Sequence, residues 1–305
     1  EKVGQLFVAQ LMTKNDNSSE IYKQISEYKI GGIILSNGTP KKTAEVTNKM
    51  QSISDVPLLI GIDGEWGINM RIDSTPKFPW NMSLGALKDN GYIEKIGKSI
   101  GNHSKRMGIH INFAPVVDIN TNPINPIIGN RSYGEDKYNV TSKALSFTKG
   151  MQEEGVLACA KHFPGHGDTS KDSHKTLPTI GFNKKRILDV ELYPYRTLIK
   201  EGLAAIMIAH LNVPSLESNY NFPSSLSKNI VTNILKNKLK FKGLIITDAL
   251  GMKGVTSYDK ENIDLMAFKA GNDVLLMSGD IKQGVASIVN AYKSTDISEK
   301  RLAYS

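Results

Sequence analysis

Cysteine is almost absent from this chain of 305 residues. The single cysteine, Cys159, cannot form a disulfide within the chain, which excludes a small disulfide-stapled fold and gives no sign of secretion. No apolar run approaches the roughly 20 residues that a membrane-spanning helix needs. The chain also lacks an arginine-rich arm, an interleaved aromatic array and zinc-ligand spacing, so the sequence does not predict nucleic-acid binding or a structural metal.

Acidic residues are fewer than basic ones. The 38 Lys and Arg against 30 Asp and Glu give a formal net charge of +8, and many lysines lie in helical stretches such as 228–242. Such a surface is usually only solvated, and the alternative is attraction of an anionic substrate or polymer. The compartment stays open between the cytoplasm, the periplasm and a lipid-anchored position in a bacterium.

Short apolar runs alternate with longer amphipathic segments along the whole chain. This alternation is typical of parallel βα units, and eight such pairs predict a single-domain (β/α)8 TIM-type barrel over residues 1–305. An open doubly wound sheet is less favoured, because no glycine-rich turn follows the first run. The expected strands are 5–11, 32–35, 57–63, 109–118, 157–162, 204–210, 243–248 and 273–277. The expected helices are 19–28, 42–52, 93–107, 137–154, 184–201, 228–239, 261–270 and 282–292.

Polar side chains end five of these strands. In a barrel, the carboxyl ends of all strands meet on one face, and the active site is built there. We therefore expect residues far apart in the sequence to share one pocket. They are Asp63, Asp118, Lys161 with His162, His210 and Asp248.

The segment after the fifth strand, 161–174, contains three of the six histidines among Gly, Pro, Ser and Asp residues. Such a composition predicts an exposed loop, and loops carry chemistry more often than strands do. A metal-dependent barrel hydrolase could use His162, His166, Asp168 and His174 as ligands, but the first strand lacks the His-x-His that such barrels commonly supply.

Several stretches together resemble glycoside hydrolase family 3, in order and over nearly the whole chain. They are Ile-Asp-Gly-Glu-Trp-Gly at 62–67 with Arg71, Phe-Ala-Pro-Val-Val-Asp at 113–118, Asn-Arg-Ser-Tyr-Gly at 130–134, the loop 161–174, and Thr-Asp at 247–248. More narrowly, the chain resembles the bacterial β-N-acetylglucosaminidases of that family, whose acid/base is a histidine on the loop after the fifth strand.

The resemblance implies a role for each matching residue. Asp248 matches the nucleophile, His174 the general acid/base and Asp172 its partner. The residues implied to hold the sugar are Asp63, Arg71, Arg131, Lys161 and His162, with His210 lining the pocket. No metal and no organic cofactor are implied.

Elementary chemistry agrees with this assignment. A retaining glycosidase needs a nucleophile on one side of the anomeric carbon and a proton donor on the other. A histidine with a pKa near 6.5 can exchange a proton close to neutral pH, and Asp172 can orient His174 because residues two apart in an extended segment point the same way. From position alone, Asp248 could equally cap the next helix.

Asp118, His166 and Asp168 are expected to play structural parts. A buried lysine needs a carboxylate, so Lys161 should lie near Asp118 or another acid, and we expect Asp118 to orient Lys161 or the nearby loops. His166 and Asp168 should shape their loop. Trp66 stands where family members often have glycine, so the backbone there should differ or the ring should pack under the sugar site.

The sequence thus predicts a monomeric, retaining, exo-acting β-N-acetylglucosaminidase acting on a glycan or on a cell-wall fragment with a 1,6-anhydro muramic acid. Alternatives are a phosphorylase or a β-glucosidase on the same scaffold, the metal-dependent barrel hydrolase, and a carbohydrate-binding barrel without catalysis. Many relatives append a further carboxyl-terminal domain, which the sequence to Ser305 does not show.

Overall fold

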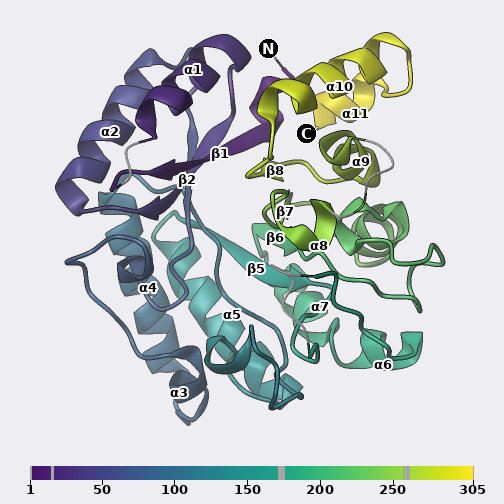
Figure 1. Ribbon diagram of the computed structural model, residues 1–305. Coiled ribbons are helices and arrows are strands. Elements are labelled where there is room, and N and C mark those ends of the chain that lie inside the picture. The colour runs from purple at the N-terminus through teal and green to yellow at the C-terminus, as the bar shows by residue number, and fades with distance from the viewer. Residues whose placement is uncertain (1, 15–16, 171–175, 257, 259–261, 305) are drawn as a thin grey trace.

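The computed structural model describes residues 2–14, 17–170, 176–256, 258 and 262–304. Within them, one sheet of eight parallel strands occupies the centre, and helices surround it (Figure 1). The strands are β1 (Phe7–Met12), β2 (Gly32–Asn37), β3 (Leu59–Ile62), β4 (Ile111–Asn112), β5 (Leu157–Phe163), β6 (Ala205–Ile208), β7 (Leu244–Thr247) and β8 (Leu275–Leu276).

The sheet closes on itself as a barrel. The first and last strands pair in parallel, with Phe7 opposite Leu275, and Figure 1 shows the purple β1 beside β8. Between β7 and β8, Ile246 forms a bridge with Val274, and the Thr247 N–H donates to the Val274 carbonyl at 3.0 Å. The (β/α)8 architecture predicted from the alternating runs is therefore confirmed.

Seven of the predicted helices form close to their expected ranges. They are α1 (Ser18–Tyr28), α2 (Pro40–Ile53), α4 (Gly91–Arg106), α5 (Lys137–Glu153), the π-type helix η5 (Asn229–Lys238), α9 (Ile263–Ala270) and α10 (Ile281–Lys293). Three short α-helices among the described residues were not predicted: α3 (Asn81–Gly85), α8 (Lys253–Thr256) and α11 (Glu299–Tyr304). No described helix is both long enough and apolar enough to cross a bilayer.

Two predicted elements were wrong in extent. The helix expected over 184–201 is two helices, α6 (Lys184–Asp189) and α7 (Tyr193–Lys200), because Pro194 suits the first turn of a new helix and not a helix interior. The strand expected over 109–118 is regular only at β4. Pro115 has no N–H to give to a ladder, and beyond it only an isolated bridge joins Val116 to Lys161.

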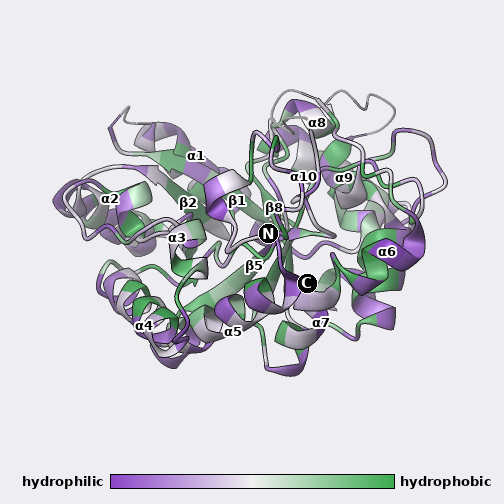
Figure 2. Cartoon of the chain, turned by 90° about the horizontal axis from the view of Figure 1, so that it is seen from below, coloured by the Kyte–Doolittle hydropathy of each residue, from purple (hydrophilic) through white to green (hydrophobic). Residues whose placement is uncertain are grey.

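Apolar side chains fill the barrel and the layer around it. Alternate strand residues such as Val8, Ile34, Cys159 and Ile246 form one buried cluster inside the barrel, and their neighbours pack outward against the helices. The hydrophobic strands accordingly lie at the centre of Figure 2, with hydrophilic residues on the outer helices. The interior of the barrel is a packed core, so a ligand of the barrel binds at the ends of the strands and not inside it.

Candidate active site

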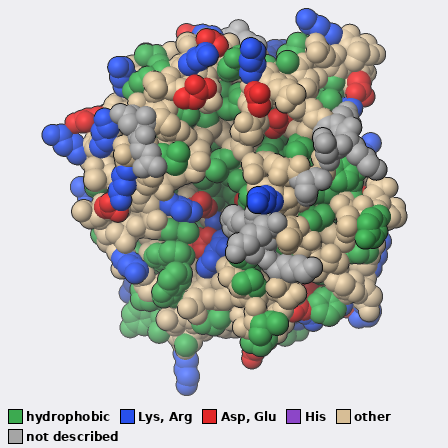
Figure 3. All heavy atoms as spheres, viewed as in Figure 1, with side chains coloured by type: hydrophobic (Ala, Val, Ile, Leu, Met, Phe, Trp, Pro, Cys, Tyr) green, Lys and Arg blue, Asp and Glu red, His purple; other side chains and the backbone are tan. Residues whose placement is uncertain are grey.

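The carboxyl ends of the strands surround a cavity of about 810 Å³. Figure 3 shows a hollow near the middle of this face, in which acidic and basic side chains come together. Each of the eight strands, or the loop that follows it, contributes to the wall. This is the position at which barrel enzymes bind their substrates.

Two consecutive residues of β5, Lys161 and His162, both line the cavity. A regular strand points successive side chains to opposite faces, so it could not present both. The ladder between β5 and β6 is irregular between Ala160 and Phe163, and we attribute the shared direction of the two side chains to this irregularity.

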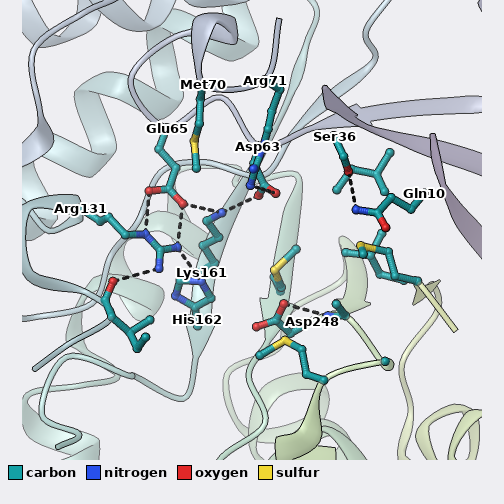
Figure 4. Close-up of a pocket in the computed structure, with 18 of the residues that line it drawn as sticks. Gln10, Ser36, Asp63, Glu65, Met70, Arg71, Arg131, Lys161, His162 and Asp248 are labelled. Atoms are coloured by element: carbon teal, nitrogen blue, oxygen red, sulfur yellow. Dashed lines mark hydrogen bonds and ion pairs between the residues drawn. The ribbon is translucent and has the colours of Figure 1, made fainter. Parts of the chain in front are cut away.

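Lys161 lies at the centre of a group of five charged side chains that we call the charged cluster (Figure 4). Its Nζ is 2.8 Å from Asp63 Oδ1 and 2.8 Å from Glu65 Oε1. Arg71 Nη2 contacts the other Asp63 oxygen at 3.0 Å. Arg131 donates from Nε and Nη2 to the two Glu65 oxygens, at 2.9 and 2.8 Å. Four of the predicted sugar-binding residues are thus brought together.

Lys161 and Glu65 remain ionised although they are buried. Burial alone would lower the pKa of Lys161, but Asp63 and Glu65 outweigh it and raise that pKa. Burial would likewise raise the pKa of the Glu65 carboxyl, whereas Lys161 and Arg131 lower it. Fixed ammonium, guanidinium and carboxylate groups can donate to and accept from the hydroxyls of a ligand. The carboxylates expected near Lys161 are therefore Asp63 and Glu65.

Asp118 positions His162 rather than Lys161. Its Oδ2 lies 2.7 Å from His162 Nδ1, and its Oδ1 accepts the backbone N–H groups of His162 and His166 at 3.2 and 2.6 Å. Because a carboxylate only accepts, Nδ1 carries a proton, and Nε2 lies 3.2 Å from Arg131 Nη2. Asp118 was expected to orient either Lys161 or the nearby loops, and the structure shows that it orients the loop after β5.

Asp248 follows β7 directly and lines the cavity. Its Oδ1 accepts the backbone N–H of Ala249 at 2.8 Å. The next helix, α8, begins only at Lys253, so Asp248 is not its N-cap. Burial would raise the pKa of Asp248, but His162, His210 and the Ala249 N–H outweigh it and lower that pKa. The site therefore holds an ionised carboxylate open to the cavity, as a nucleophile requires.

His210 lies behind the cavity wall. Its side chain is fully buried and is not among the residues that line the cavity, although the sequence predicted it there. Nε2 is 3.0 Å from the Ala249 carbonyl, and Nδ1 is 2.7 Å from Ser225 Oγ. Since a carbonyl only accepts, Nε2 carries the proton. The backbone of Ala249 thus separates His210 from the cavity, and the ring supports the turn after Asp248.

The described part of the loop after β5 is held by side chains around His166. His166 lines the cavity, its Nδ1 is 2.7 Å from Thr169 Oγ1, and its carbonyl accepts from Asn125 Nδ2 at 2.8 Å. Burial lowers the pKa of His166 to about 4, so the ring is neutral. The predicted acid/base pair, Asp172 and His174, lies outside the described residues.

Comparison with known proteins identifies the family. A model of the Glycosyl hydrolase family 3 N terminal domain matches residues 1–305. The chain belongs to glycosyl hydrolase family 3. The resemblance drawn from the motifs is thereby confirmed.

Similar proteins carry related names. A "Beta-hexosaminidase A" of Pseudoalteromonas piscicida is 35% identical over 94% of this chain and 53% of its own length. A "Beta-hexosaminidase" of Neisseria meningitidis serogroup C is 31% identical over 81% of this chain and 71% of its own length. The solved family 3 β-N-acetylglucosaminidase of Paenibacillus sp. strain FPU-7 is 35% identical, with a TM-score of 0.92 over 99% of this chain and 60% of that one. The chain thus spans little more than half of the first of these relatives.

Glu65 is the site residue that sequence reasoning missed. Its side chain is completely buried, yet it touches both Lys161 and Arg131. A signal was present, because Glu65 lies two residues after Asp63, and in an extended segment such residues share a side.

Trp66 itself does not adopt a left-handed backbone conformation. The left-handed conformation falls on the next residue, Gly67, at φ 106°. The Trp66 ring packs on Trp80, with ring centroids 4.1 Å apart, and Trp66 is not among the residues that line the cavity. Trp66 is therefore not part of the cavity wall, and the alternative expectation, that the backbone here differs from that of family members, stays a prediction.

Proposed function

We propose that the protein is a retaining, exo-acting β-N-acetylglucosaminidase. The observation that carries this proposal is that the ionised carboxylate of Asp248 lies outside the charged cluster but in the same cavity. The charged cluster itself is suited to sugar hydroxyls. The names of the family 3 relatives support the same sugar, and the retaining outcome follows from a carboxylate nucleophile that forms a covalent intermediate.

In this proposal, the charged cluster and His162 hold the non-reducing sugar. Asp63 accepts hydrogen bonds from hydroxyls, and Arg71, Arg131 and Lys161 donate to them. Glu65 holds Lys161 and Arg131 in place. We assign Glu65 to this group because it lines the cavity and fixes two of the cations. His210 acts as a positioning residue, because it holds the turn after Asp248 and helps to lower the pKa of that carboxyl.

The proposed reaction has two steps. Asp248 attacks the anomeric carbon and forms a glycosyl ester, while His174, oriented by Asp172, gives its proton to the leaving oxygen. The same histidine then takes a proton from water, which attacks the anomeric carbon and releases Asp248. A lowered pKa keeps Asp248 ionised over the pH range in which a histidine can change its charge.

The proposed substrate is a terminal β-linked N-acetylglucosamine on a glycan or a peptidoglycan fragment. The formal charge of +8 suits an anionic fragment such as one carrying muramic acid. We further propose that the protein acts as a monomer.

The first test is release of nitrophenol from its β-N-acetylglucosaminide and from its β-glucoside. We expect turnover of the N-acetylglucosaminide in preference to the glucoside. Asp248→Asn should lower kcat by about 10³-fold or more, because it removes the nucleophile and keeps the shape of the side chain.

Asp296→Asn provides the matched control, since Asp296 is a half-exposed carboxylate that pairs with Lys269 away from the cavity. It should keep wild-type activity. Undiminished turnover by Asp248→Asn, or a preference for the glucoside, would count against the proposal.

A further inference from the structure

The loop after β4 and the loop after β5 pack directly against each other. Gly167 of the second loop lies on the backbone of the first, because a Cβ added there would lie only 2.0 Å from the Ile119 carbonyl oxygen. Ile127 and His166, one from each loop, line the cavity. The contact between the two loops therefore borders the wall of the active site.

One buried amide, that of Asn125 in the loop after β4, joins the two loops. Its Nδ2 donates to the His166 carbonyl at 2.8 Å and to Thr169 Oγ1 at 3.4 Å. Asn125 is only 7% exposed. A buried amide depends on such partners, because little water reaches it to replace them.

The oxygen of the same amide shapes the loop after β4. Asn125 Oδ1 accepts the backbone N–H groups of Ile127 and Ile128, both at 2.9 Å. The Ile127 carbonyl in turn accepts from Arg131 Nη1 at 3.2 Å. Arg131 belongs to the charged cluster that is proposed to hold the sugar. The two ends of one side chain therefore connect this arginine with the loop after β5.

Thr169 is a second tie at the same point of the loop after β5. Its hydroxyl lies 2.7 Å from His166 Nδ1 and donates to the His166 carbonyl at 3.2 Å. Asn122 Nδ2 donates to the Thr169 carbonyl at 3.3 Å. His174, the proton donor of the proposed reaction, follows soon after Thr169 in the sequence. The described part of the loop is thus fixed just before the segment that contains the donor.

We propose that Asn125 is a positioning residue for proton transfer to the leaving group. Its Nδ2 fixes the segment that leads to His174, and its Oδ1 keeps that segment in register with Arg131 and the sugar. Asn125 is not among the residues that line the cavity, so it acts through others. This inference rests on the proposed function, in which the proton donor and Asp248 act on opposite sides of the anomeric carbon.

The need for a proton donor depends on the leaving group. A sugar alkoxide has to be protonated as the glycosidic bond breaks, whereas 2,4-dinitrophenolate leaves as a stable anion. General acid catalysis contributes about 10²–10⁴-fold to the rate, and here it acts in the first step, which kcat/KM reports. N,N′-diacetylchitobiose and 2,4-dinitrophenyl β-N-acetylglucosaminide therefore share the first sugar and differ in their need for the donor.

Asn125→Asp is the variant that tests the proposal. It keeps the oxygen that shapes the loop after β4 and removes the donor to the loop after β5. We expect kcat/KM for the disaccharide to fall about 10²-fold, the loss typical of a small misplacement of a catalytic group. For the dinitrophenyl substrate, kcat/KM should stay close to the wild-type value, because attack by Asp248 on this substrate needs no proton donor.

Thr169→Val is the second variant, since it removes the hydroxyl and keeps the shape of the side chain. It should show the same selective loss for the disaccharide. Because both side chains act in one network, the double variant should lose about as much as the more impaired single variant, and not the product of both losses. Melting temperatures show that each variant is folded.

Asn139→Asp is the matched control. Asn139 Nδ2 also donates to two backbone carbonyls, those of Gly85 and Tyr133, at 3.0 and 3.4 Å. This residue lies on α5, outside the cavity wall. The control variant therefore loses the same kind of contacts and gains the same charge. It should keep the wild-type kcat/KM for both substrates.

Equal losses for the two substrates in both variants would overturn the inference, because Asn125 and Thr169 would then serve sugar binding or the fold as a whole. Unchanged kcat/KM for the disaccharide in both variants would overturn it as well. Failure of the wild type to cleave either substrate would instead refute the proposed function, and the inference would fall with it.

Discussion

Buried carboxylates in this protein differ in whether a cation accompanies them. Glu65 has two cationic partners, and Asp63 has Lys161 and Arg71. Asp264 on α9 is as well buried, but among the described residues its only hydrogen-bond partner is Ser278, whose Oγ lies 2.9 Å from Oδ2. Burial raises the pKa of Asp264 to about 6. Ionised Asp264 is therefore a local weakness, whereas ionised Glu65 is held by its partners.

This difference predicts how stability depends on pH. The pKa of Asp264 is about 6 in the native state and close to 3.8 when unfolded, so the native state binds its proton more tightly. Protonation of Asp264 therefore stabilises the native state fully below about pH 4, and this stabilisation is lost as the pH rises through 6. The loss is about 3 kcal/mol. In urea unfolding, the free energy of unfolding of Asp264→Asn relative to that of the wild type should increase by this amount between pH 4 and pH 8.

Asp55→Asn is the control for this experiment, because the Asp55 side chain is 63% exposed. It should reproduce the wild-type dependence on pH. If the difference in free energy of unfolding between Asp264→Asn and the wild type stayed constant from pH 4 to pH 8, the raised pKa of Asp264 would be contradicted.

At the residue scale, the sequence located most of the cavity. Residues at strand ends could be predicted because a barrel gathers those ends on one face. Glu65 was missed because its importance comes from contacts with Lys161 and Arg131, which are distant in the sequence. His210 was placed in the cavity because strand position does not reveal that the backbone of Ala249 lies in between.

At the scale of elements, α4 and α5 pack unusually closely through glycines. A Cβ added at Gly150 of α5 would lie 2.1 Å from the carbonyl oxygen of Glu94 on α4, and one at Gly97 would lie 2.3 Å from the Phe147 carbonyl oxygen. Such distances are shorter than any real contact, and the atoms that would have to move are backbone. The helices can therefore approach this closely only with glycine at both positions.

Gly150→Ala should therefore destabilise the protein, although alanine is the better helix former. We expect a loss of about 2 kcal/mol, typical of overpacking, in urea unfolding. Gly181→Ala is the matched control, since a Cβ there meets nothing within 4 Å and should change stability little. Stability of Gly150→Ala equal to that of the control would show that the two helices can move apart freely.

The elements themselves were predictable where hydrophobic period and length agreed. The period identified α1, α2, α4 and α5 within a few residues of their ends. It did not show that Pro194 starts a second helix, or that the ladder of β4 stops before Pro115. Short helices such as α8 depend on tertiary contacts, which a local pattern does not contain.

At the scale of the whole molecule, the barrel joins residues from the two ends of the chain. β1 pairs with β8, so Met12 and Met277 share a wall although they are far apart in the sequence. The charged cluster comes from β3, β5 and the loop after β4, so the order of strands around the ring places it across the cavity from Met12 and Met277. The motifs could not predict this arrangement, because they mark only the charged cluster and Asp248.

The central claim is that Asp248 forms a covalent bond to the sugar in this cavity. A fluorinated N-acetylglucosaminyl fluoride that slows the second step should trap that intermediate. Mass spectrometry of the intact protein should show one added sugar, and peptide mapping should place it on Asp248. A label on another residue, or continued turnover with no label, would contradict the account.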